Sequence, residues 1–200
     1  MVEQLLASWQ TEVMPRGGSD GHLNGIQLSR SDGYFNRSAH SESHVMNVQV
    51  SVERAELPHV DEIVPLFDAY RRFYGSADNP RARSFLEERI ARHESVVFLA
   101  RLQGVAVGFC QLYPCFASVS LTRMFVLYDL FVAPQARRCG AAAALLRAAV
   151  DFAAGQGAGQ LMLQTAITNL PAQRLYEREG WVRDNDFYVY EYQLATGKHS

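Results

Sequence analysis

Residues 127–146 read LYDLFVAPQARRCGAAAALL, and the order of features within them decides the fold. An apolar, β-type run ends at Val132, and Pro134 then opens a loop that carries two arginines and one glycine. The loop leads directly into an Ala/Leu-rich helix. A helix N-terminus presents N–H groups without intrahelical acceptors, and its dipole favours an anion. With Arg137 and Arg138 beside it, this stretch predicts a phosphate-binding loop between a strand and a helix.

The composition is that of an ordinary globular chain. Its 200 residues carry 19 basic and 21 acidic side chains, a net charge of −2, and 48% are hydrophobic. This suffices for one sizeable core and gives no reason to expect nucleic acid or a membrane as a partner. No apolar run approaches the ~20 residues that span a bilayer, and no secretory signal is recognisable. Three cysteines without CxxC spacing argue against disulfides or zinc and favour a cytoplasmic localisation.

Residues 1–45 differ from the rest of the chain. They are rich in Gly, Ser, Asn, Asp and His and show no sustained period of 2 or 3.6, so we expect a poorly ordered N-terminal extension. His40 and His44 have the spacing of metal ligands on a helix, but a third ligand is lacking, and we expect no metal site. The folded domain is expected over residues 46–196.

Strands alternate with helices from residue 46 onward. Periodicity and turn signals predict strand 48–52, a helix from Pro58 and another over 81–92, strands 96–101, 106–113 and 124–132, helix 140–154, strand 161–165, helix 171–179 and final strands within 181–194. A Gly-rich segment at 155–159 follows a helix and precedes a strand, the reverse of a dinucleotide fingerprint, so it is a connector. The order predicts an α/β fold with a mixed sheet.

Two motifs in this order resemble the GNAT superfamily of N-acetyltransferases. Arg137, Gly140 and Ala142 match the pyrophosphate-loop pattern Arg/Gln-x-x-Gly-x-Gly/Ala, although Arg138 stands where glycine is common. Downstream, Asn169 and the segment AQRLYEREGW at 172–181 match N-x-x-A-x-x-L-Y-x-x-x-G-F/W. The resemblance implies the GNAT fold, in which a mixed, mostly antiparallel sheet is flanked by helices and strands four and five splay apart around acetyl-CoA.

The resemblance also implies residue roles. Backbone amides after Arg137 would cradle the pyrophosphate of acetyl-CoA, and the strand before it would pair with the pantetheine. The implied cofactor-binding set is Leu130, Phe131, Val132, Arg137, Arg138, Cys139, Gly140, Ala141, Ala142 and Asn169. Asn169 is equally well the N-cap of its helix. Tyr176 is implied as the proton donor to the departing CoA thiolate, whereas Cys139 has no expected catalytic role.

Transfer to nitrogen requires a neutral amine. A lysine-like amine of pKa ~10.4 is neutral in about one molecule in 2,500 at pH 7, whereas an α-amine of pKa ~7.8 is neutral in more than about one in ten. Asp129, within LYDLFV, is the candidate catalytic carboxylate; the roles of base, substrate anchor and structural acceptor all stay open. Tyr70, Tyr74 and Tyr113 are candidates for the acceptor pocket, with plain aromatic packing as the alternative.

Together these features predict an acetyl-CoA-dependent N-acetyltransferase that acts on a small primary amine, of the amino-acid or polyamine type, by direct transfer. The motifs look most like the subgroup that acetylates D-amino acids, polyamines or histones. A protein-lysine acetyltransferase and a non-catalytic CoA-binding sensor are the alternatives. Tyr188, Tyr190 and Tyr192 share one face of the last expected strand, as core or dimer contacts, so a homodimer stays open.

Overall fold

The computed structural model describes residues 49–192 and 194, so the predictions for residues 1–45, including His40 and His44, lie outside the described part. In chain order the elements are β1 (Val50–Arg54), the 3-10 turn η1 (Leu57–His59), α2 (Val60–Phe73), α3 (Ala82–Ala91), β2 (Val96–Leu102), β3 (Val105–Ala117), β4 (Thr122–Val132), the 3-10 turn η2 (Pro134–Ala136), α4 (Ala141–Gly155), β5 (Gln160–Leu163) and α5 (Leu170–Arg178).

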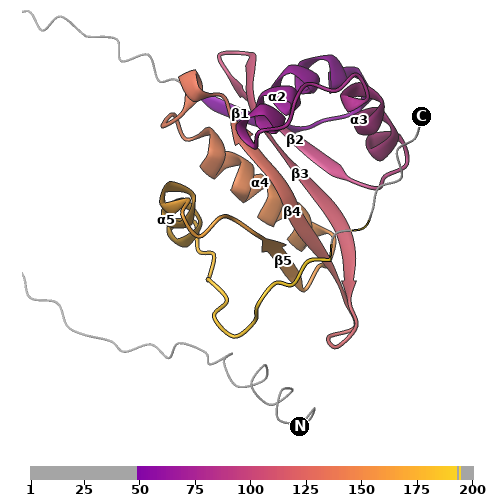
Figure 1. Cartoon of the computed structure of the whole chain (residues 1–200), viewed down its shortest axis with the longest axis vertical. Helices are drawn as coiled ribbons and strands as arrows, with labels where there is room; N and C mark the ends of the chain where they lie inside the picture. Colours follow the sequence, from indigo (N-terminus) through magenta and orange to yellow (C-terminus); the bar gives the residue numbers. More distant parts are fainter. Residues whose placement is uncertain (1–48, 193, 195–200) are drawn as a thin grey trace, which may run out of the picture. The chain divides into compact units, whose positions relative to one another are not determined.

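The strands form one mixed sheet in the order β1-β2-β3-β4-β5. The first three pairings are antiparallel: short turns join β2 to β3 and β3 to β4, whereas α2 and α3 lie between β1 and β2. Strand β4 pairs with β5 in parallel across the crossover helix α4. Helices α2 and α3 cover one face of the sheet and α4 covers the other (Figure 1). The expected GNAT-type arrangement of a mostly antiparallel sheet between helices is therefore confirmed.

Two apolar cores lie on the two faces of the sheet. On one face, the α4 side chains Leu145, Leu146 and Ala149 are completely buried against the strands. On the other, Ile63 of α2 and Leu86 of α3 are completely buried. No helix among residues 49–192 is long and apolar enough to cross a membrane. The sheet is thus held between two helical layers, and its β4–β5 side remains accessible for a site.

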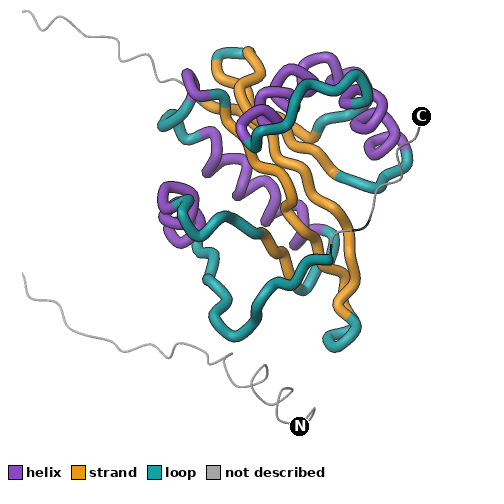
Figure 2. The backbone as a smooth tube through the Cα atoms, in the orientation of Figure 1, coloured by secondary structure: helices purple, strands orange, loops and turns teal. Residues whose placement is uncertain are grey.

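The final strands are where the sequence prediction fails. Residues 181–192 contain no strand and pass β5 as a wide loop without joining the sheet (Figures 1 and 2). The side chains of Tyr188, Tyr190 and Tyr192 are 88%, 89% and 87% exposed, so they are not core residues. The composition is of the β type, but β propensity measures how well a side chain fits a paired, half-buried surface, and within the described part of the chain this segment forms no strand pairing.

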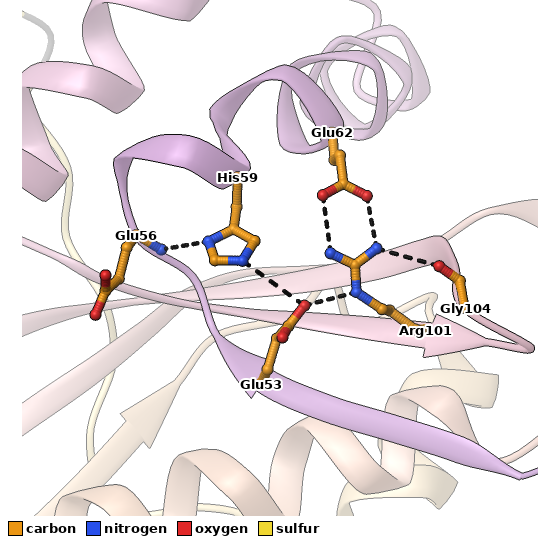
Figure 3. A network of polar contacts seen from close by, with 6 residues as sticks. All are labelled: Glu53, Glu56, His59, Glu62, Arg101 and Gly104. Atoms are coloured by element: carbon orange, nitrogen blue, oxygen red, sulfur yellow. Dashed lines mark hydrogen bonds and ion pairs between the residues drawn. The ribbon is translucent and has the colours of Figure 1, made fainter.

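A cluster of charged residues fastens β1, β2 and α2 together (Figure 3). The Arg101 guanidinium donates to the Glu53 carboxylate at 2.6 Å, to both carboxylate oxygens of Glu62 at 2.5 and 2.8 Å, and to the Gly104 carbonyl at 3.2 Å. The Arg101 side chain is only 18% exposed. Its hydrogen bond holds the pKa of Glu62 below the usual value of 4.5. One guanidinium thereby ties three elements and the β2–β3 turn.

Replacement of Arg101 by methionine is expected to lower the free energy of unfolding by about 1–2 kcal/mol at pH 7, because charge-assisted bonds from a mostly buried group are lost. Since the folded-state pKa of Glu62 is lowered, its contribution is present above pH 4.5 and disappears as pH falls through the folded-state value. Urea unfolding at pH 7 and in acid measures both effects. Arg72→Met, which breaks the exposed pair with Asp78, is the matched control and should cost less than about 0.5 kcal/mol. Equal losses in the two variants would contradict the assignment.

Candidate active site

The sheet opens between β4 and β5. The two strands pair only over four residues, from Met124 opposite Gln160 to Leu127 opposite Leu163. Beyond that point β5 turns away toward α5 while β4 continues to Val132 (Figure 1). A cleft of about 440 Å³ occupies the opening. Its strand walls are Leu127, Tyr128, Leu130, Phe131 and Val132 on β4 and Leu163, Gln164 and Thr165 at the end of β5. The expected separation of these strands is confirmed.

A β-bulge lies where the strands separate. Asp129 pairs with Gln111 and Leu127 with Leu112, so Tyr128 has no partner across from it on β3. An extra residue shifts the side-chain alternation by one position. Leu127 packs in the α4-side core, Asp129 turns toward α2, and the Tyr128 side chain is 70% exposed. The bulge therefore determines which way the carboxylate points.

The predicted phosphate-binding loop has unused N–H groups. Arg138 and Gly140 adopt positive φ angles of 63° and 91°, and Gly140 is the N-cap residue of α4. The amides of residues 138–143 donate to no backbone carbonyl among the described residues. Two left-handed residues before a helix turn successive N–H groups toward one point, which makes an anion-binding concavity. The side chains that follow are Ala141, Ala142 and Ala143, so nothing bulky screens the amides.

Two side chains of this loop are used internally. The Arg137 Nε donates to the Val132 carbonyl at 3.3 Å, which fixes the start of the side chain beside the cleft. The Cys139 Sγ donates to the Ala136 carbonyl at 2.7 Å, and Cys139 does not line the cleft. Only the main chain of Cys139 therefore remains available for a ligand.

The opposite wall of the cleft comes from α5. Asn169 caps this helix, because its Oδ1 accepts from the Ala172 amide at 3.4 Å, and Asn169 also lines the cleft. The Tyr176 ring packs against Trp181, with 6.3 Å between ring centroids. Burial, followed by the neighbouring Tyr74, raises the pKa of Tyr176, so its hydroxyl stays protonated. Asn169 thus caps α5 and also lines the cleft. The Tyr176 hydroxyl is a protonated hydrogen-bond donor in the cleft wall.

Helix α2 closes the remaining side with Tyr70, Phe73 and Tyr74, which all line the cleft. Behind them Asp129 is 5% exposed, and the Tyr70 hydroxyl donates a hydrogen bond to its carboxylate. Burial raises the pKa of Asp129 to about 6, although the bond from Tyr70 opposes the shift. The carboxylate therefore reaches the cleft through Tyr70 rather than directly.

The cleft brings together most of the residues that the sequence singled out. Asp129, Tyr113 and Cys139 do not line it; Tyr113 contacts the ring of Tyr128 from outside, with 5.8 Å between centroids. Lining residues absent from the predicted site are Tyr128, Gln164, Thr165, Leu175 and Arg178, among others. These residues could have been predicted from their place in the fold, because the end of β5 and the inner side of α5 must border any opening between β4 and β5. No cluster of three or more potential metal ligands occurs within the described residues.

Comparison with known proteins identifies the family. The family model described as "Acetyltransferase (GNAT) family" matches residues 63–181, more than half of the chain. The chain belongs to the GNAT acetyltransferase family. Among its GNAT relatives, the uncharacterized N-acetyltransferase YhfO of Bacillus subtilis (strain 168) is 44% identical over 142 residues, which cover 70% of this chain and 95% of YhfO. As a GNAT N-acetyltransferase, the chain uses acetyl-CoA.

Further GNAT relatives support the family, and one of them is named for its acceptor. A crystal structure of a probable acetyltransferase matches with a TM-score of 0.69 and 40% identity, covering 73% of this chain and 99% of that one. Aminoglycoside N(6')-acetyltransferase type 1 of Serratia marcescens is 30% identical over 125 residues, which cover 60% of this chain and 84% of that enzyme.

Proposed function

We propose that this GNAT enzyme transfers acetyl from acetyl-CoA directly to a small primary amine, with an α-amino group as the preferred acceptor. One observation carries the proposal: a single cleft adjoins an anion loop, an unpaired strand edge, a protonated tyrosine and a tyrosine–carboxylate pair. Acyl transfer to nitrogen has four requirements: the donor must be held, its carbonyl polarised, the leaving group protonated and the amine deprotonated. Each of these groups matches one of them.

The anion loop fits the pyrophosphate of acetyl-CoA. Its amides at 138–143 donate to no backbone carbonyl among the described residues, and Arg137 and Arg138 add positive charge in the loop itself. Arg178, which pairs with Glu179, also lines the cleft. Beyond Leu127 the edge of β4 that faces the opening has no β5 partner, so the peptide groups of Leu130–Val132 are placed to bind the pantetheine arm. When bound, acetyl-CoA supplies the acetyl group as an activated thioester. An N–H of this edge serves as the oxyanion donor, an interaction worth ~3 kcal/mol in other acyl transfers.

Arg137→Ala is expected to raise the dissociation constant for acetyl-CoA about tenfold, the loss of one charge-assisted hydrogen bond to a phosphate. Arg147→Ala is the matched control, since Arg147 lies on α4, pairs with Glu179 and does not line the cleft. Isothermal titration with acetyl-CoA compares the two variants. Unchanged affinity in Arg137→Ala, or equal losses in both, would rule out the loop as the phosphate site.

At the reacting centre two tyrosines have opposite tasks. The Tyr176 hydroxyl, whose pKa burial raises, donates its proton to the departing sulfur. The Tyr70 oxygen accepts a proton from the amine while its own proton passes along the existing hydrogen bond to Asp129. Asp129 is therefore the base and Tyr70 its relay. Tyr74 lines the cleft with Tyr70 and is close enough to Tyr176 to affect its pKa, which supports an amine bound between Tyr70 and Tyr176.

The pKa of Asp129 favours one class of acceptor. With a base of pKa about 6, removing a proton from an α-amine of pKa ~7.8 is uphill by about 2.4 kcal/mol, and from a lysine-type amine of pKa ~10.4 by about 6 kcal/mol. The second cost is as large as the whole 10²–10⁴-fold gain that a general base provides, or larger. The carboxylate thus suits the α-amino group of an amino acid or short peptide better than a polyamine.

The test is thiol release from acetyl-CoA with a panel of L- and D-amino acids, polyamines, aminoglycosides and lysine peptides. We expect turnover on amino acids or other small α-amines, with the specificity constant falling as acceptor pKa rises. Turnover confined to lysine peptides would replace the proposal with protein acetylation. Binding of acetyl-CoA without turnover on any acceptor would instead favour a sensor.

A further inference from the structure

One end of the cleft is built from aromatic side chains. Helix α2 contributes Tyr70, Phe73 and Tyr74, and β4 contributes Tyr128; all four line the cleft, and we call them the aromatic wall. The ring of Tyr74 makes T-shaped contacts with both of its α2 neighbours, with 5.1 Å between centroids to Tyr70 and 5.2 Å to Phe73. Tyr128 makes the same kind of contact with Tyr113 of β3, at 5.8 Å. Each ring of the wall is therefore held by another ring.

The aromatic wall is accessible to a ligand and carries no cation of its own. Tyr74 is 62% exposed and Tyr128 is 70% exposed. Within the described part of the chain, arginines lie over the rings of Phe85, Phe116 and Phe152, and none lies over the aromatic wall. The face of an aromatic ring is negative and attracts a cation within about 6 Å of its centre. The wall can therefore hold a positively charged group from outside the protein.

Asp129 adds a full negative charge at the same place. Its side chain is 5% exposed, and no cationic side chain of the described residues pairs with it; the Tyr70 hydroxyl is its hydrogen-bond donor. Burial raises the pKa of Asp129 to about 6, so the carboxylate is still charged at pH 7. A buried charge is normally paired, because removing it from water costs several kcal/mol. The carboxylate behind the aromatic wall thus lacks its counter-charge.

We infer that the aromatic wall and Asp129 together form a cation site that binds the acceptor as its ammonium ion. The rings supply cation–π attraction, and the carboxylate supplies the opposite charge through the Tyr70 hydroxyl. The inference rests on the proposed function for the identity of the bound amine. It narrows the acceptor class to amines that are protonated at neutral pH and excludes aryl amines, which carry no charge there. Recognition and deprotonation then use the same groups, since the ammonium lies beside the Tyr70 oxygen that leads to Asp129.

Choline and 3,3-dimethyl-1-butanol are matched probes for the charge. They have the same shape and the same hydroxyethyl arm, and differ only in a cationic nitrogen against a neutral carbon. Neither carries an N–H group, so binding is measured without turnover, by proton NMR titration of the full chain at pH 7.5. We expect choline to bind at least about tenfold more tightly, which corresponds to the attraction of one desolvated cation by a ring. Equal affinities, or no binding of choline, would overturn the inference.

Ring variants locate the bound cation. Tyr74→Leu and Tyr128→Leu should each weaken choline binding about fivefold, because each removes one ring face. Tyr74→Phe keeps the ring and should restore the wild-type affinity. Phe116→Leu is the matched control, since Phe116 is 72% exposed on β3 and does not line the cleft. An equal loss in Phe116→Leu, or no loss in either tyrosine-to-leucine variant, would contradict the site. Thermal midpoints of all four variants verify folding.

The pH dependence of choline affinity isolates Asp129, because choline keeps its charge at every pH. The affinity should fall as pH decreases through about 6, where the carboxylate becomes protonated. The side chains whose own pKa responds to Asp129 are Tyr70, Tyr113 and Cys110, and burial raises the pKa of all three, so none of them titrates between pH 5 and 8. Asp129→Asn should bind choline about tenfold less tightly at pH 7.5 and without this pH dependence. A pH dependence that persists in Asp129→Asn would overturn the role of the carboxylate.

Choline binding and acetyl transfer fail separately. Turnover on amines by an enzyme that does not bind choline would remove the cation site and leave acetyl transfer in place. Choline binding that responds to Tyr74→Leu and Asp129→Asn, in an enzyme that acetylates no small amine, would support the cation site and remove the proposed function.

Discussion

Replacement of Tyr176 by phenylalanine is expected to lower kcat about 100-fold, which is the lower end of the range for loss of a general acid. The KM for acetyl-CoA should change less than about threefold. The ring remains in place against Trp181, so only the hydroxyl is removed. Because burial raises the pKa of Tyr176, the wild-type acid stays protonated, and kcat should show no alkaline decline up to about pH 9. Stopped-flow detection of free CoA measures the rate, and titration calorimetry measures binding.

The outcome that separates catalysis from structure is the ratio of the two losses. If kcat and acetyl-CoA affinity fall together, or if the thermal midpoint drops, Tyr176 is a packing residue of the cleft wall. Tyr176→Leu, which also removes the ring, provides the comparison: it should add a loss of stability to the loss of rate.

Asp129→Asn is expected to reduce kcat/KM for the amine about 100-fold at pH 8, because the amide can accept no proton. In the wild type the rate should fall as pH decreases through about 6, where the carboxylate becomes protonated. This limb should disappear in Asp129→Asn, leaving only the titration of the acceptor itself. Steady-state rates between pH 5 and 9 with a saturating small amine test both expectations.

Tyr70→Phe tests the relay. The hydrogen bond from Tyr70 lowers the pKa of Asp129, so its removal should move the acidic limb of the pH–rate profile to higher pH.

An acidic limb that persists unchanged in Asp129→Asn would exclude Asp129 as the base and leave it a structural acceptor. Folding is controlled independently. A pKa raised in the folded state means that the charged carboxylate destabilises the fold above pH 6, so Asp129→Asn should unfold at an equal or higher temperature.

Local sequence predicted the elements whose signal is local. The order of strands and helices from residue 50 to 180 is confirmed, as are the turn at Gln103 and Gly104, with φ angles of 52° and 82°, and the stop at Gly180, with φ of 88°, just after α5 and its C-cap. The loop before α4, with its left-handed Arg138 and Gly140, could be located from the sequence because Gly140, the arginines and the following alanines are contiguous.

Features that depend on distant partners were beyond the sequence. The bulge at Tyr128 depends on the register of β4 against β3, and the sequence hints at it only through a break in the apolar alternation at Asp129. The Arg101 cluster joins residues that are far apart in the chain, so no spacing revealed it. The prediction of final strands within 181–194 failed for the same reason. Whether a β-type stretch becomes a strand depends on the edge of another strand, which the local sequence does not reveal.

The two ends of the cleft use different parts of the polypeptide: main-chain groups at one end and side chains at the other. The proposed phosphate end offers main-chain N–H groups at 138–143, which any small side chain leaves intact provided that Gly140 keeps its left-handed φ. The proposed acceptor end is lined by the side chains of Tyr70, Phe73 and Tyr74, on a helix that contributes nothing to the loop at 138–143. Mutations in α2 can therefore change which amine is accepted while the donor stays bound. Descendants of such a protein can diverge in acceptor while they inherit one unaltered donor site.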